Sequence, residues 1–138
     1  MKIALQRVND AVHFVGNSDT TDVKIHIDGS ADIGGEGLGA RPMELVLMAL
    51  GSCSALDFVN ILKKQRQQID DLQIAVEGQR RDEIPHIFTA IHITFKLQGP
   101  IDPARAEKAA ELAVKKYCSV HDMLAAGGVA ISYAVEVS

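Results

Sequence analysis

The chain has 138 residues, of which 47% are hydrophobic and 23% are charged, and its net charge is −4. This composition predicts a single globular domain over residues 1–138, and the absence of any lysine- or arginine-rich run excludes nucleic acid as a partner. The longest uncharged apolar run, between Glu44 and Asp57, is shorter than the roughly 18 residues of a membrane span, so we expect no membrane partner. Because the N-terminus lacks the apolar core of a signal peptide, we expect a cytoplasmic protein.

Three short strands and a glycine-rich loop are predicted for the first forty residues. The strands are expected at 2–8, 11–16 and 22–28, and apolar and polar residues alternate most regularly in the third. Turn-forming residues separate the strands, which favours an antiparallel meander. For the glycine-rich loop at 29–40, we expect either a cover over the entrance of a site or simple flexibility.

A long helix is predicted from Met43 to about Gln67, with Pro42 in its first turn, where the missing N–H of proline costs nothing. Residues 45–50 are apolar on every side, the second half is amphipathic, and Cys53 lies near the change of pattern. Such a helix is roughly 37 Å long, about the width of a domain of this size. Burial on every side is therefore better explained by a partner subunit than by one small chain.

The second half of the chain combines strands and helices. The predicted elements are strands at 72–79 and 87–97, a helix from 103 to about 117, a short helix at 120–126 and a strand at 129–137. Asp102 and Ser119 are the expected N-caps of the two helices. Because strands occur in runs along the chain, we predict an α+β fold with mainly antiparallel sheets packed around the long helix.

Two classes of catalytic site find little support in the sequence. Among the five histidines, only His121 lies at a ligand-like spacing from a cysteine, Cys118, and no CxxC, HxxxH or HxH motif occurs. We therefore expect no metal ion. The chain also lacks the G-x-S-x-G turn of serine hydrolases.

Cys53 and Cys118 remain as the candidates for chemistry, and both could equally be inert core residues. A thiol becomes reactive when a nearby positive charge lowers its pKa. Arg80 is the first candidate for that charge, since continued alternation of its strand would place it on the apolar face. The alternatives are Arg7, Arg41 and Arg81 as activating residues, and a structural pairing of Arg80 with Asp82 or Glu83.

Two segments carry a resemblance to a known family. Residues 42–57, Pro-Met-Glu-Leu-Val-Leu-Met-Ala-Leu-Gly-Ser-Cys-Ser-Ala-Leu-Asp, and residues 116–120, Lys-Tyr-Cys-Ser-Val, resemble the two cysteine motifs of the OsmC/Ohr family. These are the osmotically inducible and organic hydroperoxide resistance proteins, and the chain is most similar to their YhfA-type branch. The order of predicted elements is similar to the family over nearly the full chain.

The resemblance implies an intertwined homodimer that reduces organic hydroperoxides. Cys53 would be the attacking thiolate, oxidised to a sulfenic acid, and Cys118 the resolving thiol that closes a disulfide. A dithiol, lipoyl-protein based in the family, would then reduce the disulfide, and no further cofactor is implied. We expect apolar helix residues to receive the alkyl part of the substrate, namely Leu50, Leu56 and Phe58.

The chain departs from the family pattern at three points. Active members have an N-terminal arginine, which has no convincing counterpart here, and a glutamate where this chain has Met43. Glu44 follows one place late, and on a straight helix it could reach Cys53 only from an antiparallel partner helix across a dimer. Ser119 stands where the family usually has proline. These departures favour an alternative, a non-catalytic protein of the same fold that binds a small apolar ligand or senses redox state through its thiols.

Overall fold

The computed structural model describes residues 1–138, which form two compact units, Met1–Val46 and Leu47–Ser138. The longest helix, α1 (Pro42–Lys64), begins in the first unit and continues through the second. Each unit is described by itself below.

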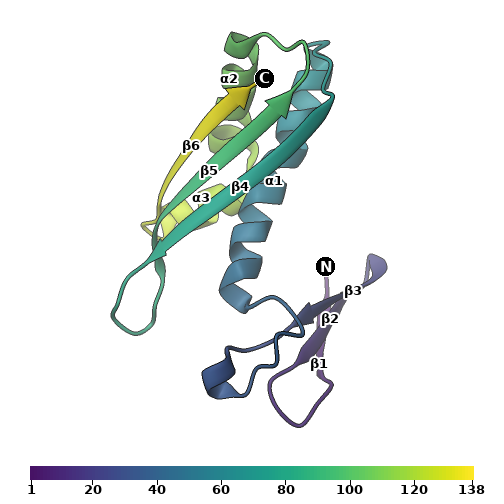
Figure 1. Ribbon diagram of the computed structural model, residues 1–138, viewed down its shortest axis with the longest axis vertical. Coiled ribbons are helices and arrows are strands. Elements are labelled where there is room, and N and C mark those ends of the chain that lie inside the picture. Colours follow the sequence, from purple (N-terminus) through teal and green to yellow (C-terminus); the bar gives the residue numbers. More distant parts are fainter. The chain divides into compact units, whose positions relative to one another are not determined.

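The first unit contains a three-stranded antiparallel meander, as predicted (Figure 1). Its strands are β1 (Ile3–Arg7), β2 (Phe14–Ser18) and β3 (Thr21–Ile27). The second strand begins later than expected because the Asn9 side chain accepts hydrogen bonds from the N–H groups of Ala11 and His13 and holds that segment in a turn.

One buried carboxylate orders the glycine-rich loop, which includes the short 3₁₀ helix η1 (Ala31–Ile33). Asp28 is only 2% exposed. Its two oxygens accept hydrogen bonds from the backbone N–H groups of Gly29, Glu36 and Leu38, at 2.8, 2.9 and 3.0 Å. Of the two expectations for this loop, simple flexibility is disfavoured, since its backbone is tied to Asp28 at three points.

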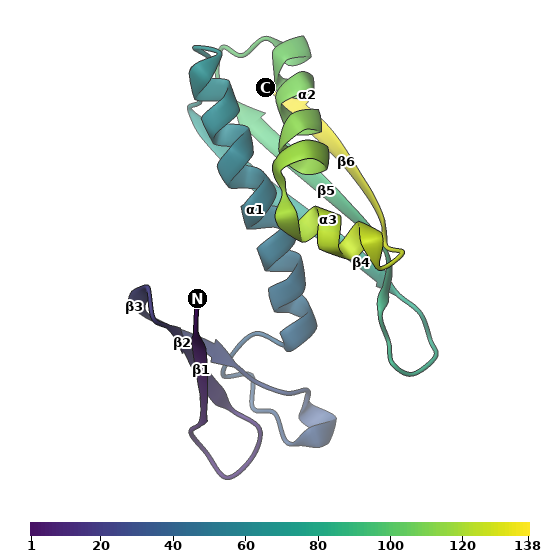
Figure 2. The same cartoon turned by 180° about the vertical axis from the view of Figure 1, so that it is seen from behind.

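The second unit is one sheet with helices on one face. Its elements are β4 (Asp71–Arg80), β5 (Phe88–Gln98), α2 (Pro103–Leu112), the π-helical turn η2 (Ala113–Tyr117), α3 (Ser119–Ala126) and β6 (Ala130–Val137). β4 pairs antiparallel with β5, and β6 pairs with β5 in parallel because the connection between them crosses over through α2 and α3. Figures 1 and 2 show α2, α3 and this unit's part of α1 on the same face of the sheet.

The core of the second unit lies between this sheet and the helices. Alternate residues of β5 point inward, as the period of a strand requires, and the rings of Phe58 and Phe95 pack with centroids 4.7 Å apart. The fully buried apolar side chains include Leu50, Phe58, Leu62, Ile91, Ile93, Phe95, Leu97 and Val114.

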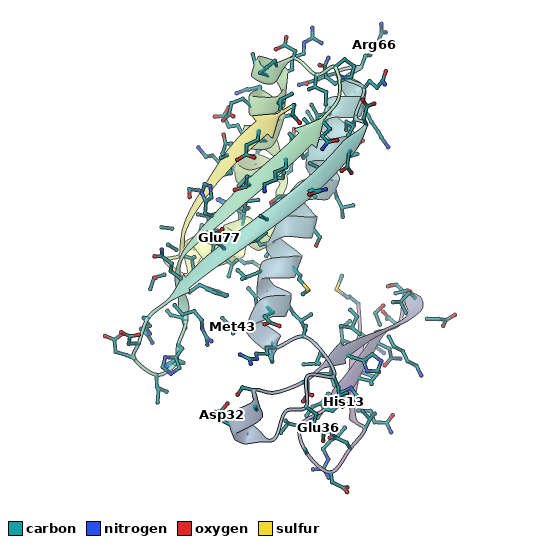
Figure 3. All side chains as sticks on the ribbon, viewed as in Figure 1. His13, Asp32, Glu36, Met43, Arg66 and Glu77 are labelled. Atoms are coloured by element: carbon teal, nitrogen blue, oxygen red, sulfur yellow. The ribbon has the colours of Figure 1, made fainter.

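Several predicted boundaries were wrong. α1 ends at Lys64, and Arg66 just beyond it (labelled in Figure 3) has a positive φ of 58°, which a continuing helix does not allow. The predicted helix 103–117 is α-helical only to Leu112. The strand predicted at 87–97 begins at Phe88, and its pairing with β4 shifts at Arg80. The N-cap of α3 is Cys118 rather than Ser119.

α1 is unusual because much of its apolar surface is uncovered. By length and composition it could cross a membrane, although the core helix of a protein in water passes the same test. Only 28% of its most apolar stretch is buried within the chain, and Met48 and Leu56 are 57% and 75% exposed. The expected burial of residues 45–50 on every side is therefore not achieved by one chain.

Candidate functional site

The site is built around Cys53 on α1 and Cys118 at the start of α3, and both are free thiols. Cys53 is half-buried, and its sulfur lies 4.0 Å from the hydroxyl oxygen of Ser119. The structure thus brings together two predicted site residues that are separated by most of the second unit's sequence.

Cys118 is buried, 1% exposed, and has a structural task of its own. The π-helical turn η2 ends at Tyr117, and Cys118 takes an extended conformation with φ −73° and ψ 104°. Its sulfur accepts the backbone N–H of His121 at 3.3 Å, which makes it the N-cap of α3. The same sulfur lies 4.0 Å from the backbone oxygen of Leu50 on α1.

The environment favours ionisation of Cys53. Burial raises the pKa of its thiol, but four interactions act in the opposite direction, and the pKa lies below its ordinary value. They are hydrogen bonds from the N–H of Val120, from the thiol of Cys118, and from the hydroxyl and the N–H of Ser119. All these groups belong to residues 118–120, so the start of α3 sets the pKa of Cys53.

The environment of Cys118 has the opposite effect. Burial raises the pKa of its thiol, and the nearby Cys53 thiolate raises it further, while Ser54 and the N–H of His121 lower it less. Ser54 is fully buried, and its hydroxyl oxygen has no hydrogen-bond partner. The hydroxyl can therefore donate a hydrogen bond to the Cys118 sulfur when that thiol ionises. The pair is thus asymmetric: Cys53 is the stronger acid and the more exposed thiol.

The two other predicted site residues have partners of their own. The Arg80 guanidinium is exposed and donates a hydrogen bond to the backbone oxygen of His86, in the turn between β4 and β5. The Glu44 carboxylate accepts the backbone N–H of Arg41 at 2.9 Å and so caps the start of α1. Their roles beside Cys53 stay predictions.

Comparison with known proteins decides the family. The family model for OsmC-like proteins matches residues 34–134, a span that includes both cysteines. The chain belongs to the OsmC-like family. This membership confirms the resemblance carried by the two cysteine motifs.

Two individual proteins are also similar to the chain. Protein YhfA of Escherichia coli K12 is 45% identical over 84 residues, which span 60% of this chain and 63% of the length of YhfA. A crystal structure of a hypothetical protein from Aquifex aeolicus VF5 is 33% identical, with a TM-score of 0.81 over 99% of this chain and 96% of that one.

A more distant relative shows the fold alone. An organic hydroperoxide resistance protein OsmC from Legionella pneumophila, described as a predicted redox protein, is 15% identical, with a TM-score of 0.71 over 99% of this chain and 97% of that one. The predicted α+β fold of the OsmC type is therefore confirmed.

The apolar wall predicted for this OsmC-like site is only partly available. Leu50 and Phe58 are fully buried in the core, so neither can contact a substrate without rearrangement. Leu56, one helical turn after Cys53, is 75% exposed. Of the three expected residues, Leu56 alone offers an apolar surface beside the thiol.

Sequence reasoning missed the groups that act on the two sulfurs. The sequence predicts Ser119 as a helix cap, whereas its hydroxyl lies 4.0 Å from the Cys53 sulfur. Ser54 was not singled out, although it is buried beside Cys118. The available signal was the Cys-Ser pair that occurs twice, as Cys53-Ser54 and as Cys118-Ser119.

Proposed function

We propose that the chain is a thiol-dependent peroxidase that reduces organic hydroperoxides. The Cys53 thiolate attacks the terminal oxygen of the hydroperoxide, the O–O bond breaks, and the alkoxide leaves as an alcohol after taking a proton. Cys53 becomes a sulfenic acid. The Cys118 sulfur then attacks the Cys53 sulfur, a disulfide forms and water leaves. In sum, two thiols and one hydroperoxide give one disulfide, one alcohol and one water.

One observation carries the proposal: two free thiols share a site in which their acidities are pushed apart. The lowered pKa of Cys53 increases the thiolate fraction near neutral pH, which is the nucleophilic form. The raised pKa of Cys118 keeps that thiol protonated, as suits a group that acts only in the second step. Two inert core cysteines would give no reason for this asymmetry.

An organic substrate is favoured over hydrogen peroxide for two reasons. The exposed Leu56 offers an apolar contact one helical turn from Cys53. Relatives of the same fold from Legionella pneumophila and Elizabethkingia anophelis are described as organic hydroperoxide resistance proteins.

We infer that a second copy of the chain covers its exposed apolar surface. In the first unit, one face of the meander forms an apolar groove of about 360 Å³. Ile3, Leu5, Val23 and Ile25 line it and are 52–67% exposed. Large exposed apolar patches on a protein surface mark interaction sites. We therefore propose a homodimer, of the intertwined kind that the family resemblance implies, in the cytoplasm.

The catalytic cycle also needs a reductant for the disulfide. We propose a dithiol, such as a lipoylated protein, because a dithiol can open the disulfide by exchange and close its own.

The test is steady-state consumption of cumene hydroperoxide with dihydrolipoamide as the reductant. We expect consumption by the wild type, no consumption by Cys53→Ser, and slower turnover with hydrogen peroxide. The matched control is Ser52→Ala, next to Cys53 but with its hydroxyl bonded to the Met48 carbonyl at 2.7 Å; it should retain activity. Equal consumption by Cys53→Ser and the wild type would overturn the proposal.

A redox sensor or ligand-binding protein of the same fold is the second candidate. It is favoured by the engagement of Arg80 with the β4–β5 turn and of Glu44 with the start of α1. This candidate predicts stoichiometric oxidation of Cys53 without turnover in the presence of dihydrolipoamide.

A further inference from the structure

The first turn of α3 lies beside the sulfur atoms of Cys53 and Cys118. The first N–H groups of a helix have no partner within the helix and must be satisfied from outside. Cys118 is the N-cap, so Ser119, Val120 and His121 are the first three helical residues. The N–H of the fourth, Asp122, already reaches the backbone oxygen of Cys118 at 3.2 Å.

Both sulfurs lie at this turn of α3. The Cys118 sulfur accepts the N–H of His121 at 3.3 Å. The Ser119 hydroxyl oxygen lies 4.0 Å from the Cys53 sulfur, and the N–H groups of Val120 and Ser119 lower the pKa of the Cys53 thiol. Cys53 thus faces the positive end of the α3 dipole with a side-chain donor beside it, an arrangement that stabilises a negative charge.

We propose that Ser119, together with the first turn of α3, activates Cys53 in this chain in place of a cationic side chain. The proposal deepens the proposed function and rests on it for the catalytic meaning of the thiolate. Ser119 is a catalytic residue because its hydroxyl lies against the reacting sulfur, 4.0 Å away.

The residue type at position 119 is decisive for chemical reasons. Proline is well suited to the first position of a helix, because its missing N–H has no partner there in any case. A proline at 119 would preserve the helix but would offer Cys53 neither an N–H nor a hydroxyl. Serine supplies both. Compared with a proline, the serine at position 119 thus offers two more donors at the thiol.

Cys53 needs uncharged donors because the charged side chains predicted to act on it are bonded to other groups. Arg80 is bonded to the backbone of His86, and Glu44 caps the start of α1. The groups that lower the pKa of Cys53 belong to residues 118–120 and are uncharged. Activation by a helix N-terminus is an established way to lower the pKa of a cysteine.

The experiment measures the pH dependence of iodoacetamide alkylation at Cys53 in the wild type, Ser119→Ala and Ser119→Pro. Trypsin places the two cysteines in different peptides, because Lys63, Lys64 and Lys116 lie between them. Mass spectrometry therefore reports each thiol separately in the full chain. Ser52→Ala is the control, because its hydroxyl is bonded to the carbonyls of Met48 and Ala49 instead.

We expect the midpoint for Cys53 to rise by about half a pH unit in Ser119→Ala and by about one unit in Ser119→Pro. Ser52→Ala should keep the wild-type midpoint. Below both midpoints the proline variant has about tenfold less thiolate, but each thiolate is more nucleophilic, so alkylation there slows by about threefold. An unchanged midpoint in a folded Ser119→Ala protein would overturn the role of the hydroxyl, and Ser119→Ala decides alone if the proline variant does not fold.

This result is independent of peroxidase turnover. Raised midpoints in a protein that does not consume hydroperoxide would uphold the role of Ser119 and overturn the proposed function. Unchanged midpoints in a protein that turns over normally would overturn the role of Ser119 alone.

Discussion

Cys118 is predicted to have two separable roles, a structural one as the cap of α3 and a chemical one as the resolving thiol. Its sulfur accepts the N–H of His121 at 3.3 Å, and its side chain is 1% exposed. Cys118→Ala removes both roles. Cys118→Ser removes the thiol but provides one of the best N-cap acceptors, and its hydroxyl can turn toward the Leu50 carbonyl.

The expected difference in stability follows from the cap. Loss of an N-cap acceptor typically costs about 1 kcal/mol, so Cys118→Ala should unfold more easily than Cys118→Ser by about that amount. In a chain of 138 residues this difference is roughly 4 °C in the midpoint of thermal unfolding. Both variants should fail to form the disulfide with a hydroperoxide and should stop at the Cys53 sulfenic acid.

The assay is thermal unfolding followed by circular dichroism, with Asp102→Ala as a calibration. Asp102 is the N-cap of α2 and accepts the N–H of Ala104 at 2.9 Å. Its removal should lower the unfolding midpoint by a comparable amount. Equal midpoints for Cys118→Ala and Cys118→Ser, with a clear loss for Asp102→Ala, would refute the capping role of the sulfur.

Three further predictions follow from other parts of the chain. Hydrogen bonds from the N–H groups of Leu38 and Glu36 lower the pKa of Asp28, so its stabilising effect is present above the unfolded pKa of about 3.9 and is lost as the pH falls through the folded value. Amide hydrogen exchange of Glu36 and Leu38 should therefore be faster in Asp28→Asn at pH 7, and a difference that persists far below the folded pKa would contradict this. Phe58→Ala should lower the free energy of unfolding by about 3–5 kcal/mol in urea, because the ring is fully buried; a loss below about 1 kcal/mol would contradict the packing. Ile25→Lys should reduce the mass measured by light scattering from twice 14.9 kDa toward 14.9 kDa, since it places a charge in the apolar groove; an unchanged dimer would remove that groove from the interface.

The helices and strands with strong hydrophobic periodicity could be predicted from the sequence. The residues at which some of them begin or end could not. β5 was found because its apolar residues alternate, and α1 because of its length and apolar character. β2 begins late because the Asn9 side chain bonds to nearby N–H groups, and α1 stops early at the positive φ of Arg66. These are local hydrogen-bond and backbone effects that leave little trace in hydrophobic periodicity.

The candidate site shows the same division. Cys53 and Cys118 were identified because their motifs are specific and thiol chemistry requires them. The groups that act on them could not be predicted, because Ser119 comes within 4.0 Å of the Cys53 sulfur only once the fold sets α3 against α1. The sequence pointed to a positive side chain, Arg80, whereas uncharged groups of residues 118–120 lower the pKa of Cys53.

The central claim is that Cys53 and Cys118 carry out two-thiol redox chemistry, and thiol counting with intact-protein mass tests it most directly. One equivalent of cumene hydroperoxide is added to the fully reduced protein. We predict rapid loss of two thiols and of two hydrogens in mass for the wild type, a stable sulfenic acid in Cys118→Ser, and no reaction in Cys53→Ser. Two intact thiols after several minutes with the hydroperoxide would contradict the account.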